Sequence, residues 1–476
     1  MDLKDTPLHD EIKKIINSEE KKVFHQWECY FRIRKPNNVD IKGANVGPYI
    51  KEEEKDDIYR PLKITNIDFI KDYQGANADE GSINLTIGLG MWYKILQPYR
   101  DYLEIVIKKI PQHDLDKTID MEEDSEDLVF LAIPKLNPQT VGEASRLDRY
   151  QRVDLDIAGV IDVEFQLLDL SMEKMRAVTV GGIFRKTKNE DVVKALLAKQ
   201  ASEIKIADDG LAVEGIKIIE ADNQEEREHT VIPQGTPICD LPLLVHRACG
   251  GLYSTGINMY LQDRNWYVYP LYNTDRFEKE DKTLTVFKIP NAVYDEVERT
   301  YRMDGDRLIC MATSDSFFDD HGDVRFKESG NGIRFADARM YMQGLVETKD
   351  NKAIAKRDKL NHEFLFKEMK VGDELNNFVQ TSVDNIHANP FNENSKLAYK
   401  EGNVYSFIWR NSDDKLLYPG MPAKILYLKN GEIMQLNGVL LKVHHTVQML
   451  GQAITATNYR QQTALFIYAN KAAEEQ

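Results

Sequence analysis

The chain has 476 residues, of which 42% are hydrophobic and 29% charged, and these are the values of a globular protein. They exclude extensive disorder beyond the two ends and a few charged loops, and the length predicts about three domains because a single core stops growing well below this size. A net charge of -16 opposes tight wrapping of nucleic acid, whose affinity comes chiefly from Lys and Arg side chains that displace phosphate counterions. The acidity is compatible with ordinary solubility, and also with the wall of a passage through which DNA slides without adhering.

The sequence also bounds the cellular compartment. No apolar run approaches the roughly 18 residues of a membrane helix, and residues 1–5 lack the basic and then apolar layout of a signal peptide. The four cysteines form neither a CxxC motif nor an even framework for disulfides: Cys29, Cys239, Cys249 and Cys310. We therefore expect a soluble protein made in the cytoplasm, with reduced and buried thiols.

An N-terminal arm, residues 1–22, precedes a first strand-rich domain that we place at residues 23–185. The arm has helical spacing of apolar residues within 11–17. The domain has short alternating or apolar runs typical of strands at 63–69, 82–87, 103–108, 153–157, 163–167 and 177–184. Charged insertions at 51–57 and 116–127 interrupt these runs, and we interpret them as solvated loops rather than partner-binding segments.

An α/β domain is predicted at residues 186–290. Asn189 is a fitting N-cap for a helix with Val192, Val193, Leu196 and Leu197 on one face. A second helix is expected to begin after Asp240 and to stop at Gly250-Gly251. A hairpin should follow, formed by residues 257–261 and 266–269.

A mixed connecting domain at residues 291–365 and a second strand-rich domain at residues 366–476 complete the chain. A strand is expected at 307–312, and residues 423–468 are β-patterned throughout. Asn430-Gly431 joins two apolar runs there, and it is the strongest short-range hairpin signal because both turn positions need positive φ. The predicted fold class is α+β and mainly β, with a sheet or barrel at the C-terminus and an α/β segment between two strand-rich domains that are candidates for related barrels.

Two groups of residues are candidates for chemistry. His246 and Cys249 lie three apart on one helix face, where an imidazole lowers a thiol pKa as a nucleophile requires, although nothing in the sequence orients the histidine. Asp315, Asp319, Asp320, His321 and Asp323 form the densest group of hard ligands for a divalent cation, but they lack the EF-hand order. We interpret the first group as a buried thiol beside a structural histidine and the second as a polar loop.

Other patterns have structural interpretations as well. His444 and His445 are adjacent, so on a strand they point to opposite faces and cannot chelate one ion together. Tyr267, Tyr269 and Tyr272 beside Trp266 either form an aromatic platform or belong to a strand that covers a core and an interface, and we favour the second. The glycines of Gly330-Asn-Gly332 are not part of a phosphate-binding motif, and none of the GxGxxG, GxxxxGK[ST], GxSxG or HExxH motifs occurs. No catalytic residue, cofactor or metal is predicted.

The order of segments from Gly181 onward resembles one protein family. The succession is Gly181-Gly-Ile-Phe184, the helix at 192–197, Val231-Ile-Pro-Gln-Gly235, Gly250-Gly-Leu-Tyr253, Trp266-Tyr-Val-Tyr-Pro270, Thr300-Tyr301, Gly330-Asn-Gly-Ile-Arg334, Leu417-Tyr-Pro-Gly-Met421 and the terminal hairpin. This succession resembles the baseplate or tail hub protein of contractile-tailed bacteriophages and, more distantly, the base of type VI secretion spikes. The likeness covers about residues 60–470 and rests on order rather than on an invariant signature.

The resemblance implies a homotrimer in which each subunit contributes two tube-like antiparallel β-barrel domains with α/β domain(s) between them. It further implies a pseudo-sixfold ring on the hexameric tail tube protein, a cup for the central spike protein, and contacts with neighbouring baseplate wedge proteins. DNA would pass through the channel without tight binding. The expected location is the virion tail baseplate, assembled in the host cytoplasm, with no membrane partner.

We therefore expect a virion structural protein without catalysis. The alternatives that the sequence leaves open are a metal-dependent or cysteine hydrolase using the candidate residues above, and another phage tail or neck component.

Overall fold

The computed structural model describes residues 7–17, 24–33, 58–112, 126–135, 159–203, 213–290, 299–314, 402–429, 432–450 and 459–470, with short pieces between 318 and 399. The fold is α+β and mainly β, as predicted, and its largest feature is a curled sheet of fourteen strands. No helix in these ranges is both long and apolar enough to cross a membrane.

The first part of the large sheet, here called the N-terminal β unit, contains six antiparallel strands in the order β1-β4-β5-β6-β3-β2. A pair of backbone hydrogen bonds between Phe31 and Tyr59, at 2.8 and 3.1 Å, connects β1 to the segment before β2, so the unit curls back on itself. Alternate side chains fill its core, including the fully buried Ile67, Ile83 and Phe165. The strands are β1 (Phe24–Ile33), β2 (Lys63–Asp72), β3 (Glu80–Gly88), β4 (Leu103–Gln112), β5 (Glu126–Pro134) and β6 (Val160–Asp169).

The second part, here called the C-terminal β unit, is a closed ring of six strands in the order β14-β12-β22-β23-β24-β21. The ring closes where Thr313, just after β14, exchanges backbone hydrogen bonds of 3.0 and 2.7 Å with Ile408 of β21. The strands are β12 (Thr283–Lys288), β14 (Arg307–Ala312), β21 (Gly402–Arg410), β22 (Pro422–Lys429), β23 (Glu432–Met449) and β24 (Tyr459–Asn470), with β13 (Tyr301–Asp304) on the outer side of β14. The strand expected at 307–312 is thus confirmed, and the β-patterned residues 423–468 contain strand β23 and most of β22 and β24.

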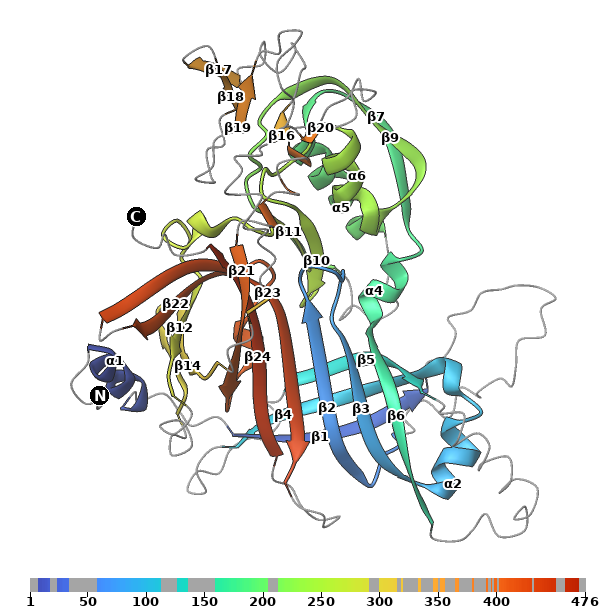
Figure 1. The fold of residues 1–476 in the computed structure, drawn as a ribbon. Coiled ribbons are helices and arrows are strands. Elements are labelled where there is room, and N and C mark those ends of the chain that lie inside the picture. Colours follow the sequence, from blue (N-terminus) through green and yellow to red (C-terminus); the bar gives the residue numbers. More distant parts are fainter. Residues whose placement is uncertain are drawn as a thin grey trace, which may run out of the picture.

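Strand β23 belongs to both units. Its first half pairs with β22 up to Val439, and from Lys442 to Gln448 it pairs with β2 of the N-terminal β unit. A register shift between Leu440 and Lys442 marks this change of neighbour, and such a bulge bends a strand and increases its twist. Figure 1 shows β6, β3, β2, β23 and β24 side by side in one layer, with β1, β4 and β5 crossing behind. The two units therefore form one continuous sheet.

The α/β part lies at one end of the molecule, where the ribbon of β7 and β9 lies beside α5 and α6 (Figure 1). Both helices and the hairpin expected from the sequence are confirmed. The elements are α4 (Leu170–Met175), β7 (Thr179–Lys188), α5 (Asn189–Glu203), β8 (Gly215–Ile218), β9 (Glu226–Pro237), α6 (Leu241–Ala248), β10 (Asn258–Gln262) and β11 (Asn265–Tyr269). Asn189 does not cap through its oxygen as predicted; its amide donates to the carbonyls of Cys249 and Gly251 and ties the start of α5 to the end of α6.

The N-terminal helix α1 (Pro7–Ile16) confirms the helical arm. Its buried Ile12 and Ile15 pack on Phe287 and Met311 of the C-terminal β unit. The remaining elements are α2 (Leu89–Met91), the short turns at Trp92–Leu96, Arg100–Tyr102, Ile238–Asp240, Thr274–Arg276 and Asp414–Leu416 (η8), and strands β15 (Phe318–Asp319), β16 (Ile333–Arg334), β17 (Val346–Lys349), β18 (Lys352–Ala355), β19 (Phe364–Lys367) and β20 (Val379–Gln380).

Several sequence expectations lie outside the described residues. These are the strand at 153–157, the charged insertions at 51–57 and 116–125, the segment Gly330–Gly332, and the turn Asn430-Gly431 itself. The strands on either side of that turn do pair, with Lys429 opposite Glu432. The proposed domain limits stay predictions. Strand β12 lies within the 186–290 segment, and it pairs with β22, which lies within the 366–476 segment.

Candidate functional site

The continuous sheet has a polar face that crosses both β units. One cross-strand row runs through six neighbouring strands, because each residue is the register partner of the next: Gln166, Ser82, Asp68, Thr446, Gln462 and Arg410. A second row contains Glu164, Asn84, Asn66, Gln448 and Arg460. These side chains are half-buried or exposed, whereas the residues between them along each strand are buried. We call this surface the polar face.

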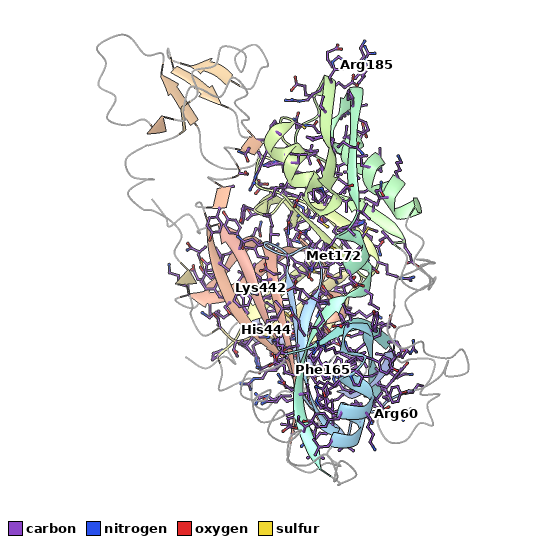
Figure 2. The ribbon with its side chains drawn as sticks, turned by 90° about the vertical axis from the view of Figure 1, so that its right-hand side faces the viewer. Arg60, Phe165, Met172, Arg185, Lys442 and His444 are labelled. Atoms are coloured by element: carbon purple, nitrogen blue, oxygen red, sulfur yellow. The ribbon has the colours of Figure 1, made fainter. Side chains whose placement is uncertain are left out.

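The alternation has a simple cause. Successive side chains of a strand point to opposite faces. Ile67, Phe69 and Val447 therefore enter the core, whereas Asn66 and Asp68 lie on the solvent-facing side. Figure 2 places Lys442 and His444 along β23 near the middle of the molecule, with Arg60 and Arg185 toward its two ends. The predicted opposition of the two histidines is confirmed, since His444 is 40% exposed and His445 is fully buried.

Charges on the polar face nearly balance. Its carboxylates are Asp68, Asp72, Glu80, Asp162 and Glu164, and its cations are Lys63, Arg410, Lys442 and Arg460. Several of the carboxylates are held by neighbouring side chains: Asp162 accepts from Thr86 at 2.6 Å, Glu80 pairs with Arg176 at 3.4 Å, and Asp68 accepts from Thr446 at 3.0 Å. The hydrogen bond with His444, at 3.2 Å, is the main cause that holds the pKa of Asp68 below its usual value. The face is polar and ordered, without an excess of cations.

A cluster of buried charges lies on the other side of this sheet, where the two units meet. We call it the junction cluster. Lys71 of β2 lies 3.1 Å from Asp414 and 3.7 Å from Asp79, and Lys109 of β4 lies 2.7 Å from Asp413 and 3.4 Å from Asp414. Both lysines come from the N-terminal β unit, and Asp413 and Asp414 come from the turn after β21 in the C-terminal β unit. Breaking such buried pairs costs far more than breaking exposed ones, so the cluster fixes how the units sit together.

The junction cluster also holds two neutral histidines. His445 contacts Thr463 through Nδ1 at 2.8 Å, and its Nε2 lies 4.0 Å from Asp414. Burial, assisted by the charges of the nearby lysines, lowers the pKa of His445 to about 4. Burial and the charge of Lys109 likewise lower the pKa of His25 to about 4.

The carboxylates of the cluster differ from one another. Burial raises the pKa of Asp79 to about 6, against the opposing influence of Lys71. The pKa of Asp414 lies well below its usual value, because the attraction of Lys71 and the other nearby cations outweighs the effect of burial. Asp414 is therefore the charged centre that both lysines share.

The candidates for a cysteine nucleophile have other partners. His246 accepts from the Leu252 amide through Nδ1 at 3.3 Å, and its Nε2 lies 3.3 Å from the Ser395 hydroxyl. The thiol of Cys249 is directed to the Val231 carbonyl at 3.9 Å, and burial raises its pKa instead of lowering it. This environment is the opposite of what a thiolate nucleophile needs.

The remaining candidates have separate outcomes. Asp315, Asp320, His321 and Asp323 lie outside the described residues, and Asp319 is described only as backbone in β15. Among the described residues no group of three or more His, Cys, Asp or Glu is placed to hold a metal ion. Trp266 and Val268 enter one core, which confirms the expected core face of this strand, whereas Tyr269, expected at an interface, enters a second core.

The junction cluster was missed from the sequence, although a signal for it exists. Lys71 is in phase with the inward-facing Ile67 and Phe69, and Lys109 is in phase with Ile105 and Ile107. A lysine at an inward position of an alternating strand requires a buried partner. The sequence does not say which carboxylate supplies it, because Asp414 lies more than 300 residues from both lysines in the chain.

Comparison with known proteins gives structural likeness only. No protein-family model matches the chain, and no curated protein sequence does. The chain is similar in structure to the tail protein from Neisseria meningitidis MC58, with 11% identity, 93% of this chain and 96% of that one covered, and a TM-score of 0.42. It is also similar to the 43 kDa tail protein of prophage MuSo2 from Shewanella oneidensis, with 8% identity, coverage of 92% and 98%, and a TM-score of 0.42. A third similar structure is the E. coli c3393 protein, a component of the type VI secretion system, with 7% identity, coverage of 86% and 74%, and a TM-score of 0.38.

Proposed function

We propose that this protein is a virion structural protein, the trimeric hub of a phage tail or baseplate, which adapts a hexameric tail tube to a trimeric central spike. The observation that carries the proposal is the pair of curled six-stranded β units that β23 joins into one continuous sheet. A chain with two such units provides six of them when three copies assemble. That arrangement resolves the mismatch between a sixfold and a threefold partner.

The polar face is the part of the molecule that would line the central channel. Duplex DNA carries one negative charge per roughly 1.7 Å of its axis, and it is retained by surfaces on which Lys and Arg are in excess. The polar face has no such excess: Asn, Gln, Ser and Thr side chains are mixed there with nearly equal numbers of carboxylates and cations. Such a wall tolerates a passing duplex without binding it tightly.

The junction cluster supports a mechanical role. A subunit that transmits force between tube and spike needs its two β units held in one orientation, and buried ion pairs between Lys71, Lys109 and Asp414 supply that constraint. The expected partners are two further copies of this chain, the tail tube protein, the central spike protein and the neighbouring wedge proteins. The role requires no catalysis, and the surroundings of His246 and Cys249 favour none.

The oligomeric state tests this proposal. Mass photometry of the purified full chain should give a species of three times 54.8 kDa, and negative-stain averages should show rings with threefold symmetry. A protein that stays monomeric, both alone and with tube and spike proteins, would contradict the hub assignment.

A further inference from the structure

We propose that the junction cluster is an acid-sensitive latch: protonation of His25 and His445 adds positive charge beside Lys71 and Lys109 and releases η8 from between the two β units. The inference goes beyond the hub assignment and does not depend on it. It concerns a local opening of one chain.

The geometry of η8 places it where it can act as a latch. Asp413 and Asp414 sit at the start of this short turn, and their carboxylates face Lys71 of β2 and Lys109 of β4. The turn is followed by the buried Leu417, and just before it Asn411 donates a 3.0 Å backbone hydrogen bond to Gln461 of β24. The attachment of η8 to the N-terminal β unit thus depends on charge pairs.

Both histidines face these same groups. His445 on β23 faces Asp414, Lys109, Lys71 and Asp413, while Thr463 of β24 binds its Nδ1. The aromatic rings of Trp27 and Phe69 pack against it. Its buried Nε2 has no hydrogen-bond partner among the described residues, and the Asp414 carboxylate lies 4.0 Å from it, beyond hydrogen-bond distance.

His25 on β1 is placed in the same way. It faces Lys109, Asp413 and Asp414, and its Nδ1 lies 3.3 Å from the side-chain oxygen of Gln461 on β24. Two lysines therefore share a buried space with two imidazoles, which the closed junction keeps neutral down to a pH of about 4.

The sign of the pH effect follows from linkage. The two histidines have pKa values of about 4 in the closed junction and an ordinary value of 6.5, so closure loses stability as pH falls below 6.5 toward 4. Asp79 acts in the opposite direction, because its pKa of about 6 lies above the ordinary 3.8, and its contribution is lost as pH rises through 6. Between pH 6 and 4.5, opening takes up two protons at the histidines and releases one at Asp79. The equilibrium constant for opening should therefore rise roughly tenfold for each unit by which the pH falls.

Hydrogen–deuterium exchange of the full chain between pH 6 and 4.5, corrected for intrinsic exchange, tests the latch. In the peptide covering residues 411–417, the corrected exchange rate should rise about tenfold for each unit by which the pH falls. The core amides of β3 and β6 should keep their protection. His445→Gln should make the opening nearly independent of pH, and Asp79→Asn should steepen it to roughly a hundredfold per unit. His444→Gln, one residue away on the opposite face, is the control and should behave as the parent.

Three results would overturn the proposal: no pH dependence at residues 411–417, an unchanged slope in His445→Gln, or equal loss of protection in all strands. If His445→Gln does not fold, His25→Gln makes the same test from the other strand. A His25→Gln protein that keeps the parent slope would equally overturn the latch.

Discussion

Replacing Asp414 by Asn should destabilise the protein by about 3 to 5 kcal/mol, the cost of breaking a buried ion pair from one side. The substitution keeps the shape of the side chain and removes its charge. Among the described residues Lys71 then keeps the ion pair with Asp79 at 3.7 Å, a carboxyl whose pKa is already raised to about 6. Lys109 keeps Asp413 at 2.7 Å, so most of the loss arises at Lys71.

The magnitude can be worked from the distances. At an effective dielectric of about 20, unit charges separated by the 3.1 Å of Lys71 and Asp414 attract by roughly 5 kcal/mol. Lys71 is only 7% exposed, so water offers little compensation when the partner is neutralised. The remaining attraction of Asp79 and local relaxation bring the net loss into the range of about 3 to 5 kcal/mol.

Urea unfolding at pH 7, followed by tryptophan fluorescence and circular dichroism, measures the change in unfolding free energy. Asp127→Asn is the matched control, because Asp127 pairs at 3.7 Å with the more exposed Lys108, the residue next to Lys109, and should cost about 0 to 1 kcal/mol. The double variant Lys71→Met with Asp414→Asn should recover at least about 2 kcal/mol of the single losses. Equal effects of Asp414→Asn and Asp127→Asn would refute the reasoning.

Three further predictions concern packing, the hairpin and the thiols. Phe165→Ala should lower the free energy of unfolding in urea by about 3 to 5 kcal/mol, because the ring is fully buried and its centroid lies 5.0 Å from that of Phe31. Glu164→Ala, on the polar face, should lower it by less than about 1 kcal/mol. Similar losses would mean that the faces are misassigned. Valines at Asn430 and Gly431 should cost about 1 to 3 kcal/mol through unfavourable φ, and an unchanged melting temperature would argue against the turn. Burial raises the pKa of all four cysteines, that of Cys239 to about 11. Iodoacetamide should therefore label the native protein slowly at pH 7.5. Rapid labelling of Cys249 alone would restore the cysteine-hydrolase alternative.

The sequence predicts elements well where one local rule suffices. The alternation of Lys63–Phe69, the hairpin in which Leu261 pairs with Trp266, and the helix from Asn189 each follow from periodicity or turn chemistry. The opposite faces of His444 and His445 follow in the same way. These features are local, so long-range contacts do not change them.

The sequence did not predict the long-range features, because several distant segments determine each of them together. No local pattern indicates that β23 leaves β22 for β2 near Leu440, since either neighbour satisfies the same apolar alternation. The N-cap assigned to Asn189 failed for a similar reason: carbonyls at the end of α6 compete for its amide. The lysines of the junction cluster signal a buried partner, but only the tertiary fold brings η8 to them.

A cryo-electron microscopy map of the assembled protein tests the central claim most directly. The account predicts a threefold ring of six β units in which the polar face, including Ser82, Asp68, Thr446 and Gln462, lines the central channel. A map in which this face points outward, or in which the chain forms no ring, would contradict the account.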